Sequence, residues 1–132
     1  MIAALYLRSA TQNDDAIAAQ QRICAEYAAA QGWRVGEVFV DDGFSGTLDD
    51  RPGLVALRDS LQERRASIVI AEDASRLFRD INKLGEFYGF CDALSVEVSY
   101  ARSRASSFDL LRSVSMEEIA ERQRLAAKGL TT

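Results

Sequence analysis

Two arginines, Arg76 and Arg79, stand three residues apart in the stretch 72–80, directly after an apolar run with the composition of a buried strand. This spacing predicts that both side chains start from one face of a beginning helix. Guanidinium groups are permanently charged and fork-shaped, which suits them to a phosphate oxyanion. Isolated pairs of this kind are more often solvated helix starts. Arginine is electrostatically unfavourable in the first turn of a helix, however, so two of them there favour an anionic ligand.

Composition limits the other kinds of chemistry. The chain has 132 residues, enough for one domain with a core, and its 48% hydrophobic and 27% charged content is that of a soluble globular protein. A net charge of −4 argues against broad nonspecific binding of nucleic acid. A local cluster of arginines can nevertheless occur on a protein with this net charge. The chain contains no histidine, the commonest general base and metal ligand, and we expect neither a metal nor a cofactor.

The two cysteines, Cys24 and Cys91, both fall on apolar helical faces. We expect buried free thiols, which fit a reducing cytoplasm. No apolar run approaches the length needed to span a membrane, and the first residues do not have the pattern of a signal peptide.

Strand and helix patterns alternate along the first hundred residues. Continuous or alternating apolar runs predict strands at 2–7, 33–40, 67–71 and 96–101. Helical periodicity predicts three helices between them, at 16–31, from 52 to the charged residues 63–65, and from about 79 to 94. This order predicts an α/β fold with a mostly parallel central sheet flanked by helices and joined by right-handed crossovers.

Residues with special backbone preferences mark several helix ends. Asp14 or Asp15 is expected to cap the first helix, Gly32 to end it, and Pro52 to open the second.

The last third of the chain differs in character. We take 1–101 as the core domain and 102–132 as a polar connection followed by a C-terminal helix. Ser115 and Glu118 fit a capping box for that helix, which is expected to reach about Lys128. Its apolar face is short, so it needs another surface to lie against, and dimerisation is one such use.

In a parallel α/β sheet, functional groups collect at the carboxyl ends of the strands. Arg8, the loop 42–51 and the Arg76/Arg79 turn each follow a predicted strand. We therefore expect them to meet at one edge of the sheet.

These segments resemble the catalytic domain of the serine recombinases, the resolvases and invertases. The resemblance rests on three motifs in register over about the first hundred residues: Tyr6-Leu7-Arg8, then Asp42-Gly43-Phe44-Ser45-Gly46 with Asp50-Arg51-Pro52-Gly53-Leu54, and Ser75-Arg76-Leu77-Phe78-Arg79-Asp80. The resemblance implies a resolvase-like three-layer fold. It also implies a reaction in which a serine forms a phosphoserine link to DNA, subunits rotate and the strands are religated, without metal. Arginines replace the metal electrostatically.

The resemblance also implies roles for particular residues. Phosphate-binding positions match Arg8, Arg51, Arg76 and Arg79, supporting positions match Tyr6 and Asp42, and Ser45 belongs to the loop beside the phosphate. Taken singly, all of these residues except Arg76 and Arg79 are better explained by structure alone: Tyr6 as a core residue, Asp42 as a turn former and Arg51 as a surface charge at a helix start.

Ala10 occupies the position at which the family carries its nucleophilic serine. A methyl group cannot attack phosphorus, so the chain as written is expected to be inactive in DNA cleavage. Strand alternation places Ser9 on the side opposite Tyr6 and Arg8, and Thr11 is a secondary hydroxyl in another register. The sequence leaves open whether Ala10 is engineered or natural.

Three functions remain as hypotheses. The first is a serine-recombinase catalytic domain that acts on DNA within a homodimer or larger assembly, and that depends on a longer parent chain or a partner for a DNA-binding domain that 1–132 lacks. The second is a non-catalytic partner or regulator of a recombinase, a role that needs neither a nucleophile at position 10 nor a basic surface. The third, a flavodoxin-like fold that binds a small phosphorylated ligand, is the weakest because Gly43 and Gly46 alone are a poor phosphate loop.

Overall fold

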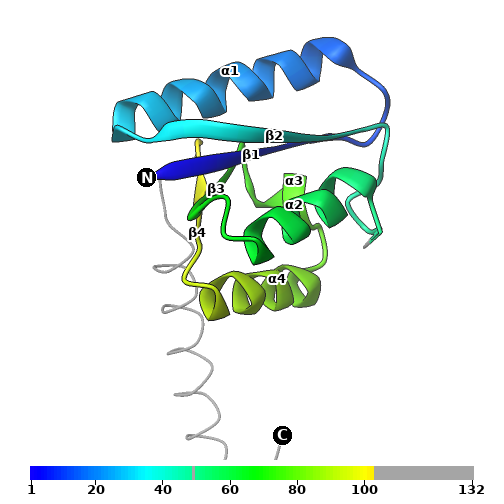
Figure 1. Ribbon diagram of the computed structural model, residues 1–132. Coiled ribbons are helices and arrows are strands. Elements are labelled where there is room, and N and C mark those ends of the chain that lie inside the picture. The colour runs from blue at the N-terminus through cyan, green and yellow to red at the C-terminus, as the bar shows by residue number, and fades with distance from the viewer. Residues whose placement is uncertain (49, 103–132) are drawn as a thin grey trace, which may run out of the picture.

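A computed structural model describes residues 1–48 and 50–102 (Figure 1). The elements follow one another as β1 Ile2–Ser9, α1 Asp14–Gln31, β2 Arg34–Asp42, α2 Pro52–Gln62, β3 Ile68–Ala71, α3 Ala74–Leu77, α4 Ile81–Ala93 and β4 Glu97–Tyr100. Each predicted strand is present, with ends displaced by one or two residues.

The strands form one four-stranded sheet in the order β2-β1-β3-β4, and all its neighbouring pairs are parallel. Helix α1 covers one face, and α2 and α4 cover the other (Figure 1). This confirms the predicted three-layer α/β fold. The chain leaves β1 toward β2 and later returns past β1 to β3, so the direction of strand addition reverses between β1 and β3. In such sheets this switch point, at the carboxyl ends, is where ligands bind.

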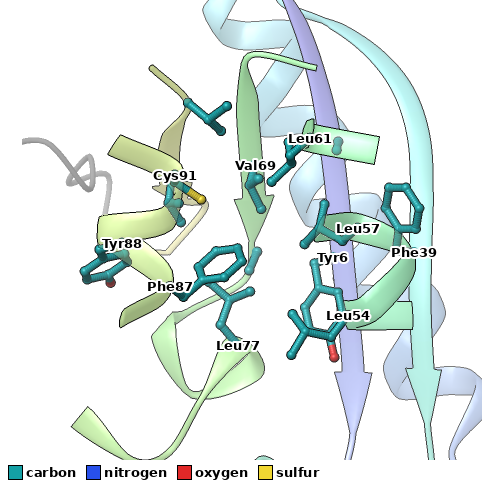
Figure 2. Close-up of a cluster of buried hydrophobic side chains, with 14 of the residues drawn as sticks. Tyr6, Phe39, Leu54, Leu57, Leu61, Val69, Leu77, Phe87, Tyr88 and Cys91 are labelled. Atoms are coloured by element: carbon teal, nitrogen blue, oxygen red, sulfur yellow. The ribbon is translucent and has the colours of Figure 1, made fainter. Parts of the chain in front are cut away.

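The alternation of β1 divides the core in two. Ala3, Leu5 and Leu7 pack beneath α1, whereas Ala4 and Tyr6 face the side of α2 and α4. Figure 2 shows Tyr6 between leucines of α2, with its hydroxyl toward the carboxyl ends of the strands.

Most predicted helix ends are confirmed. Gly32 ends α1 in the left-handed conformation at φ 77°, and Pro52 opens α2. The cap of α1 is Asn13, whose side chain accepts from the Ala16 amide, so the prediction of Asp14 or Asp15 was wrong by one residue. Asp14 lies instead in the first turn, where its charge favours the helix dipole.

The segment after β3 differs from the single helix predicted from about 79. The four-residue α3 comes first, capped by Asp73, and α4 begins afresh after Asp80. Between them, Phe78 is extended at φ −145° and ψ 141°. Arg76 therefore lies in α3 and Arg79 in the link, and the two do not share one helix face as the spacing had predicted.

The described chain ends beside the site edge of the sheet. The Ala101 amide donates to the Ala71 carbonyl, and the Arg102 amide donates to the Glu72 carbonyl. The predicted C-terminal helix with Ser115 and Glu118 lies outside the described residues. Across residues 1–48 and 50–102, no helix is long and apolar enough to cross a membrane.

Candidate functional site: an arginine cluster at the carboxyl edge of the sheet

Arg8, near the end of β1, is fully buried. Its Nε donates to the Arg76 carbonyl at 3.0 Å, its Nη1 to the Phe44 carbonyl at 2.9 Å and its Nη2 to the Ser75 carbonyl at 2.8 Å. One guanidinium thus holds together the loop after β2 and the turn after β3. Arginine suits this task because its donors form a rigid planar fork.

Gln20 fixes the backbone of the same residue. Its Oε1 accepts from the Arg8 amide at 3.1 Å, and its Nε2 donates to the Arg8 carbonyl at 2.9 Å. Gln20 is buried on α1 in line with Cys24 and Ala28, one turn apart. Sequence reasoning missed this residue. Its signal is a glutamine within an otherwise apolar stripe of a helix.

Arg51, just before α2, is also fully buried. Its Nε donates to the Leu48 carbonyl at 2.9 Å, its Nη1 to Tyr6 Oη at 3.0 Å and to the Arg76 carbonyl at 3.2 Å, and its Nη2 to the Leu77 carbonyl. The guanidinium also lies over the Phe78 ring, 5.0 Å from its centroid. Arg51 is therefore not the surface charge that its position in sequence allowed.

Asp41 completes this network. Its Oδ2 accepts from the Tyr6 hydroxyl at 2.7 Å and from the Leu54 amide at 2.9 Å, and its Oδ1 accepts from the Gly53 amide at 2.7 Å. The carboxylate thus caps the start of α2 and orients the tyrosine that Arg51 binds.

Asp42, matched by the resemblance to a supporting position, is the last residue of β2. Its Oδ1 accepts from the Asn13 amide at 2.8 Å, ahead of α1. The side chains of Asp41 and Asp42 point to opposite faces of the sheet, as successive strand residues do. The carboxylate in contact with Tyr6 is that of Asp41.

Arg76 is the least enclosed of the three arginines of the cluster that bind backbone carbonyls, with a side chain 27% exposed. Its Nε and Nη2 donate to Glu72 Oε1 at 3.2 and 2.9 Å, and its Nη1 donates to the Arg8 carbonyl at 3.2 Å. Glu72 is a second buried carboxylate that sequence reasoning did not assign to the site.

Arg79 and Ser45 form the exposed rim of the cluster. The Arg79 amide donates to the Gly46 carbonyl at 3.3 Å. A Cβ on Gly46 would lie 3.0 Å from Arg8 Nη2 and 3.1 Å from Arg79 Cγ, so this glycine lets the two arginines approach the loop closely. The Ser45 hydroxyl is 2.9 Å from that of Thr47.

Ala10 is exposed and follows directly on the end of β1. Ser9 is buried, and its hydroxyl donates to the Thr11 carbonyl at 2.6 Å. The Ser9 carbonyl in turn accepts from the Gly43 and Phe44 amides. Ser9 therefore stabilises the chain between β1 and α1, because its hydroxyl donates to the backbone carbonyl of Thr11.

The crowding of positive charge shows in the pKa of Arg8. Burial lowers this pKa most, and repulsion from Arg51, Arg76 and Arg79 lowers it further, while Tyr6 opposes the shift. The pKa of Tyr6 is raised above its usual value, mainly by burial and then by its hydrogen bond to Asp41. A bound anion would relieve the repulsion among the arginines, so the cluster is suited to phosphate or sulfate.

A family model for the resolvase N-terminal domain matches residues 3–128. The chain belongs to this family. The resemblance stated from the three sequence motifs is thereby confirmed.

Solved structures of serine-recombinase domains share the fold. The N-terminal catalytic domain of TP901-1 integrase is 20% identical, with a TM-score of 0.82, and the match covers 97% of this chain and 98% of that one. A resolvase family site-specific recombinase from Streptococcus pneumoniae is 16% identical, with a TM-score of 0.76 and coverages of 98% and 93%. The C-terminal catalytic domain of ISC1926 TnpA, an IS607-like serine recombinase, is 24% identical, with a TM-score of 0.69 and coverages of 76% and 70%. A search of curated protein sequences found no match.

In this resolvase-family chain, most of the predicted site residues lie together. The inner part of the cluster holds Tyr6, Arg8 and Arg51; the more accessible part holds Ala10, Ser45, Arg76 and Arg79. Among residues 1–48 and 50–102, no group of histidine, cysteine or acidic side chains has the arrangement of a metal site.

Proposed function

We propose that this chain is the catalytic domain of a serine recombinase that acts on DNA, with Ala10 at the position of the nucleophile. The observation that carries the proposal is the buried Arg8, tied to two loops and followed two residues later by the exposed Ala10. A side chain at position 10 thus starts beside a fixed set of positive charges. Phosphoryl transfer depends mainly on such fixed charges and on positioning.

The arginines divide the work in this proposal. Arg8 and Arg51 hold the two loops in place through backbone carbonyls, and Arg76 and Arg79, which are more accessible, contact the scissile phosphate. With serine at position 10, its oxygen would bond to phosphorus as the bond from phosphorus to the deoxyribose oxygen breaks. The serine loses its proton in this step, and the departing oxygen gains one.

Ala10→Ser tests the proposal. The variant is incubated with supercoiled DNA that carries a recognition site, after fusion to a DNA-binding domain or in the presence of an active family member. The expected product is a protein–DNA species that survives denaturing electrophoresis. The unmodified chain and the double variant Ala10→Ser/Arg76→Gln are the controls, and neither should form it.

Two results would change the interpretation. A covalent species formed by the unmodified chain, and lost in Ser9→Ala, would make Ser9 the nucleophile. No covalent species from Ala10→Ser, although the fused protein binds DNA, would count against the catalytic proposal.

The second candidate is a non-catalytic partner of a recombinase, which Ala10 and the net charge of −4 favour. It requires association with a second chain, either a copy of itself or an active member of the family. Sedimentation of the chain alone and mixed with such a member measures this. A mixed species that changes the partner's cleavage rate, without a covalent product from Ala10→Ser, would establish the regulatory role.

The proposed function includes a location in the cytoplasm. Cys24 and Cys91 are buried free thiols, which fits a reducing compartment of this kind.

A further inference from the structure

Glu72 is a buried carboxylate shared by two arginines. Its side chain is 8% exposed, its Oε1 accepts both bonds from Arg76, and its Oε2 lies 3.3 Å from Arg102 Nε. The Glu72 carbonyl also accepts from the Arg102 amide at 3.1 Å. Arg102 is the last described residue, and the chain continues from it toward position 132.

The contacts of Arg76 leave one side of its guanidinium for a ligand. Of the five N–H groups, Glu72 takes one on Nε and one on Nη2, and the Arg8 carbonyl takes one on Nη1. Within the described residues, the second N–H groups of Nη1 and Nη2 have no protein acceptor. These N–H groups are available to the oxygens of a tetrahedral anion.

The negative charge of Glu72 opposes this use of Arg76. A carboxylate with a single arginine partner attracts that partner strongly when the carboxylate is shielded from water, as Glu72 is. A second arginine on the other oxygen weakens the attraction. Arg102 on Oε2 therefore leaves more of the positive charge of Arg76 for an anion. Conversely, an anion on Arg76 leaves more of the charge of Glu72 for Arg102.

We propose that Glu72 is a positioning residue that couples anion binding at Arg76 to the anchoring of the chain at Arg102. The coupling is positive: each event strengthens the other by the same factor, as thermodynamic linkage requires. In a recombinase, this coupling would link phosphate binding at Arg76 to the contact of Arg102 with Glu72, where the chain continues beyond β4. The proposal rests on the proposed function only in that Arg76 must bind an anion.

Sulfate is the probe, titrated into the chain at constant ionic strength and followed by amide chemical shifts. Arg102→Gln is expected to weaken sulfate binding by about two- to fivefold, the range expected for a largely exposed ion pair, since Arg102 is 62% exposed. Arg34→Gln is the matched control, because Arg34 is an exposed arginine at the opposite end of the sheet, at the start of β2. It should change the affinity by less than the Arg102 variant does.

A double-mutant cycle separates coupling through Glu72 from the general field of a lost charge. If Glu72 carries the effect, Arg102→Gln does not change sulfate affinity in a Glu72→Gln background. The ratio of sulfate affinities with Arg102 and with Gln at position 102 then falls to about one. If the effect is long-range attraction, the same ratio persists in both backgrounds, which would overturn the proposal.

A second measurement uses the unmodified chain, so it stands even where Glu72→Gln fails to fold. Saturating sulfate should slow hydrogen exchange of the Arg102 amide by about the same factor, with no change at the Glu97 amide, which bonds to Ser67 at the far end of β4. Unchanged exchange at Arg102 would refute the coupling. Absence of saturable sulfate binding to the unmodified chain would instead refute the anion site, and with it the proposed function.

Discussion

Replacing Asp41 by asparagine should destabilise the fold far more than the same change at its neighbour Asp42. Asp41 is 1% exposed and accepts three hydrogen bonds, two of them on Oδ2, from the Tyr6 hydroxyl and the Leu54 amide. An asparagine keeps the most bonds with its oxygen toward the Tyr6 hydroxyl and the Leu54 amide, and it then presents its NH2 group to the Gly53 amide. The Gly53 amide at the start of α2 loses its acceptor.

The expected loss follows from these contacts. A hydrogen bond to a charged group contributes about 1.5–3 kcal/mol, and the bond from the Gly53 amide is lost outright. The bonds from Tyr6 and Leu54 then go to a neutral oxygen and are weaker, which places the expected loss near the upper end of that range, about 3 kcal/mol. This is a large part of the roughly 5–15 kcal/mol that stabilises a domain.

Urea unfolding at pH 7, followed by the fluorescence of Trp33, the single tryptophan, measures both variants. Asp42→Asn is the matched control. Asp42 is partly exposed and accepts one bond, from the Asn13 amide, which an asparagine oxygen also accepts; we therefore expect a change below about 1 kcal/mol. An equal or larger loss for Asp42→Asn would show that the assignment of Asp41 to the Tyr6–Arg51 network is wrong.

Three further predictions concern stability. Burial raises the pKa of Cys24 and of Cys91 to about 12, whereas in the unfolded chain both thiols ionise near pH 8.5. The free energy of unfolding should therefore be unaffected by these thiols below about pH 8.5 and should fall above it, by about 1.4 kcal/mol per pH unit for each thiol up to pH 12. Urea midpoints measured between pH 7 and 10 check this. Gly53→Ala should cost about 1–3 kcal/mol in the same assay, because a Cβ there would lie 2.8 Å from the Val40 carbonyl and 2.9 Å from Asp41 Oδ1, whereas Gly85→Ala, with no atom near its Cβ, should not destabilise. Sulfate at ten times its Kd should raise the Tm by about 5 °C, and more than chloride of equal ionic strength, whereas equal shifts would speak against a formed anion site.

The fold was predictable because the sequence alternates between periods of two and 3.6 residues, and because Gly32 and Pro52 are strong signals for the end of one helix and the start of the next. The break between α3 and α4 was not. Leu77, Ile81 and Leu84 keep helical spacing across it, so the periodicity predicts one continuous helix. The backbone is extended at Phe78, where the side chain makes contacts that the periodicity does not reveal. Its buried ring lies beneath the Arg51 guanidinium and packs near Phe87.

For the site, residue types and the order of the strands were enough to predict which segments meet. The direction of each side chain was not predicted, because the sequence places Asp41 and Asp42 in a turn, whereas β2 continues through both and their side chains therefore point to opposite faces of the sheet. Gln20 and Glu72 were missed for a related reason. Their local signals, a glutamine in an apolar stripe and a glutamate four residues before Arg76, are common in helices and do not indicate the partners Arg8 and Arg102 elsewhere in the chain.

The contacts of the cluster also explain why arginine, and not lysine, is found at its inner positions. Arg8 binds three carbonyls from two separate loops, and Arg51 binds three carbonyls and a tyrosine hydroxyl. An ammonium group is compact and has three donors, so it cannot reach acceptors spread this widely around a plane. The positive charges are thus fixed by the backbone that they hold together, before any anion arrives. In the proposed recombinase function, charges already in place would need no reorganisation when a phosphate binds, which is the condition under which such charges stabilise a phosphoryl transition state most effectively.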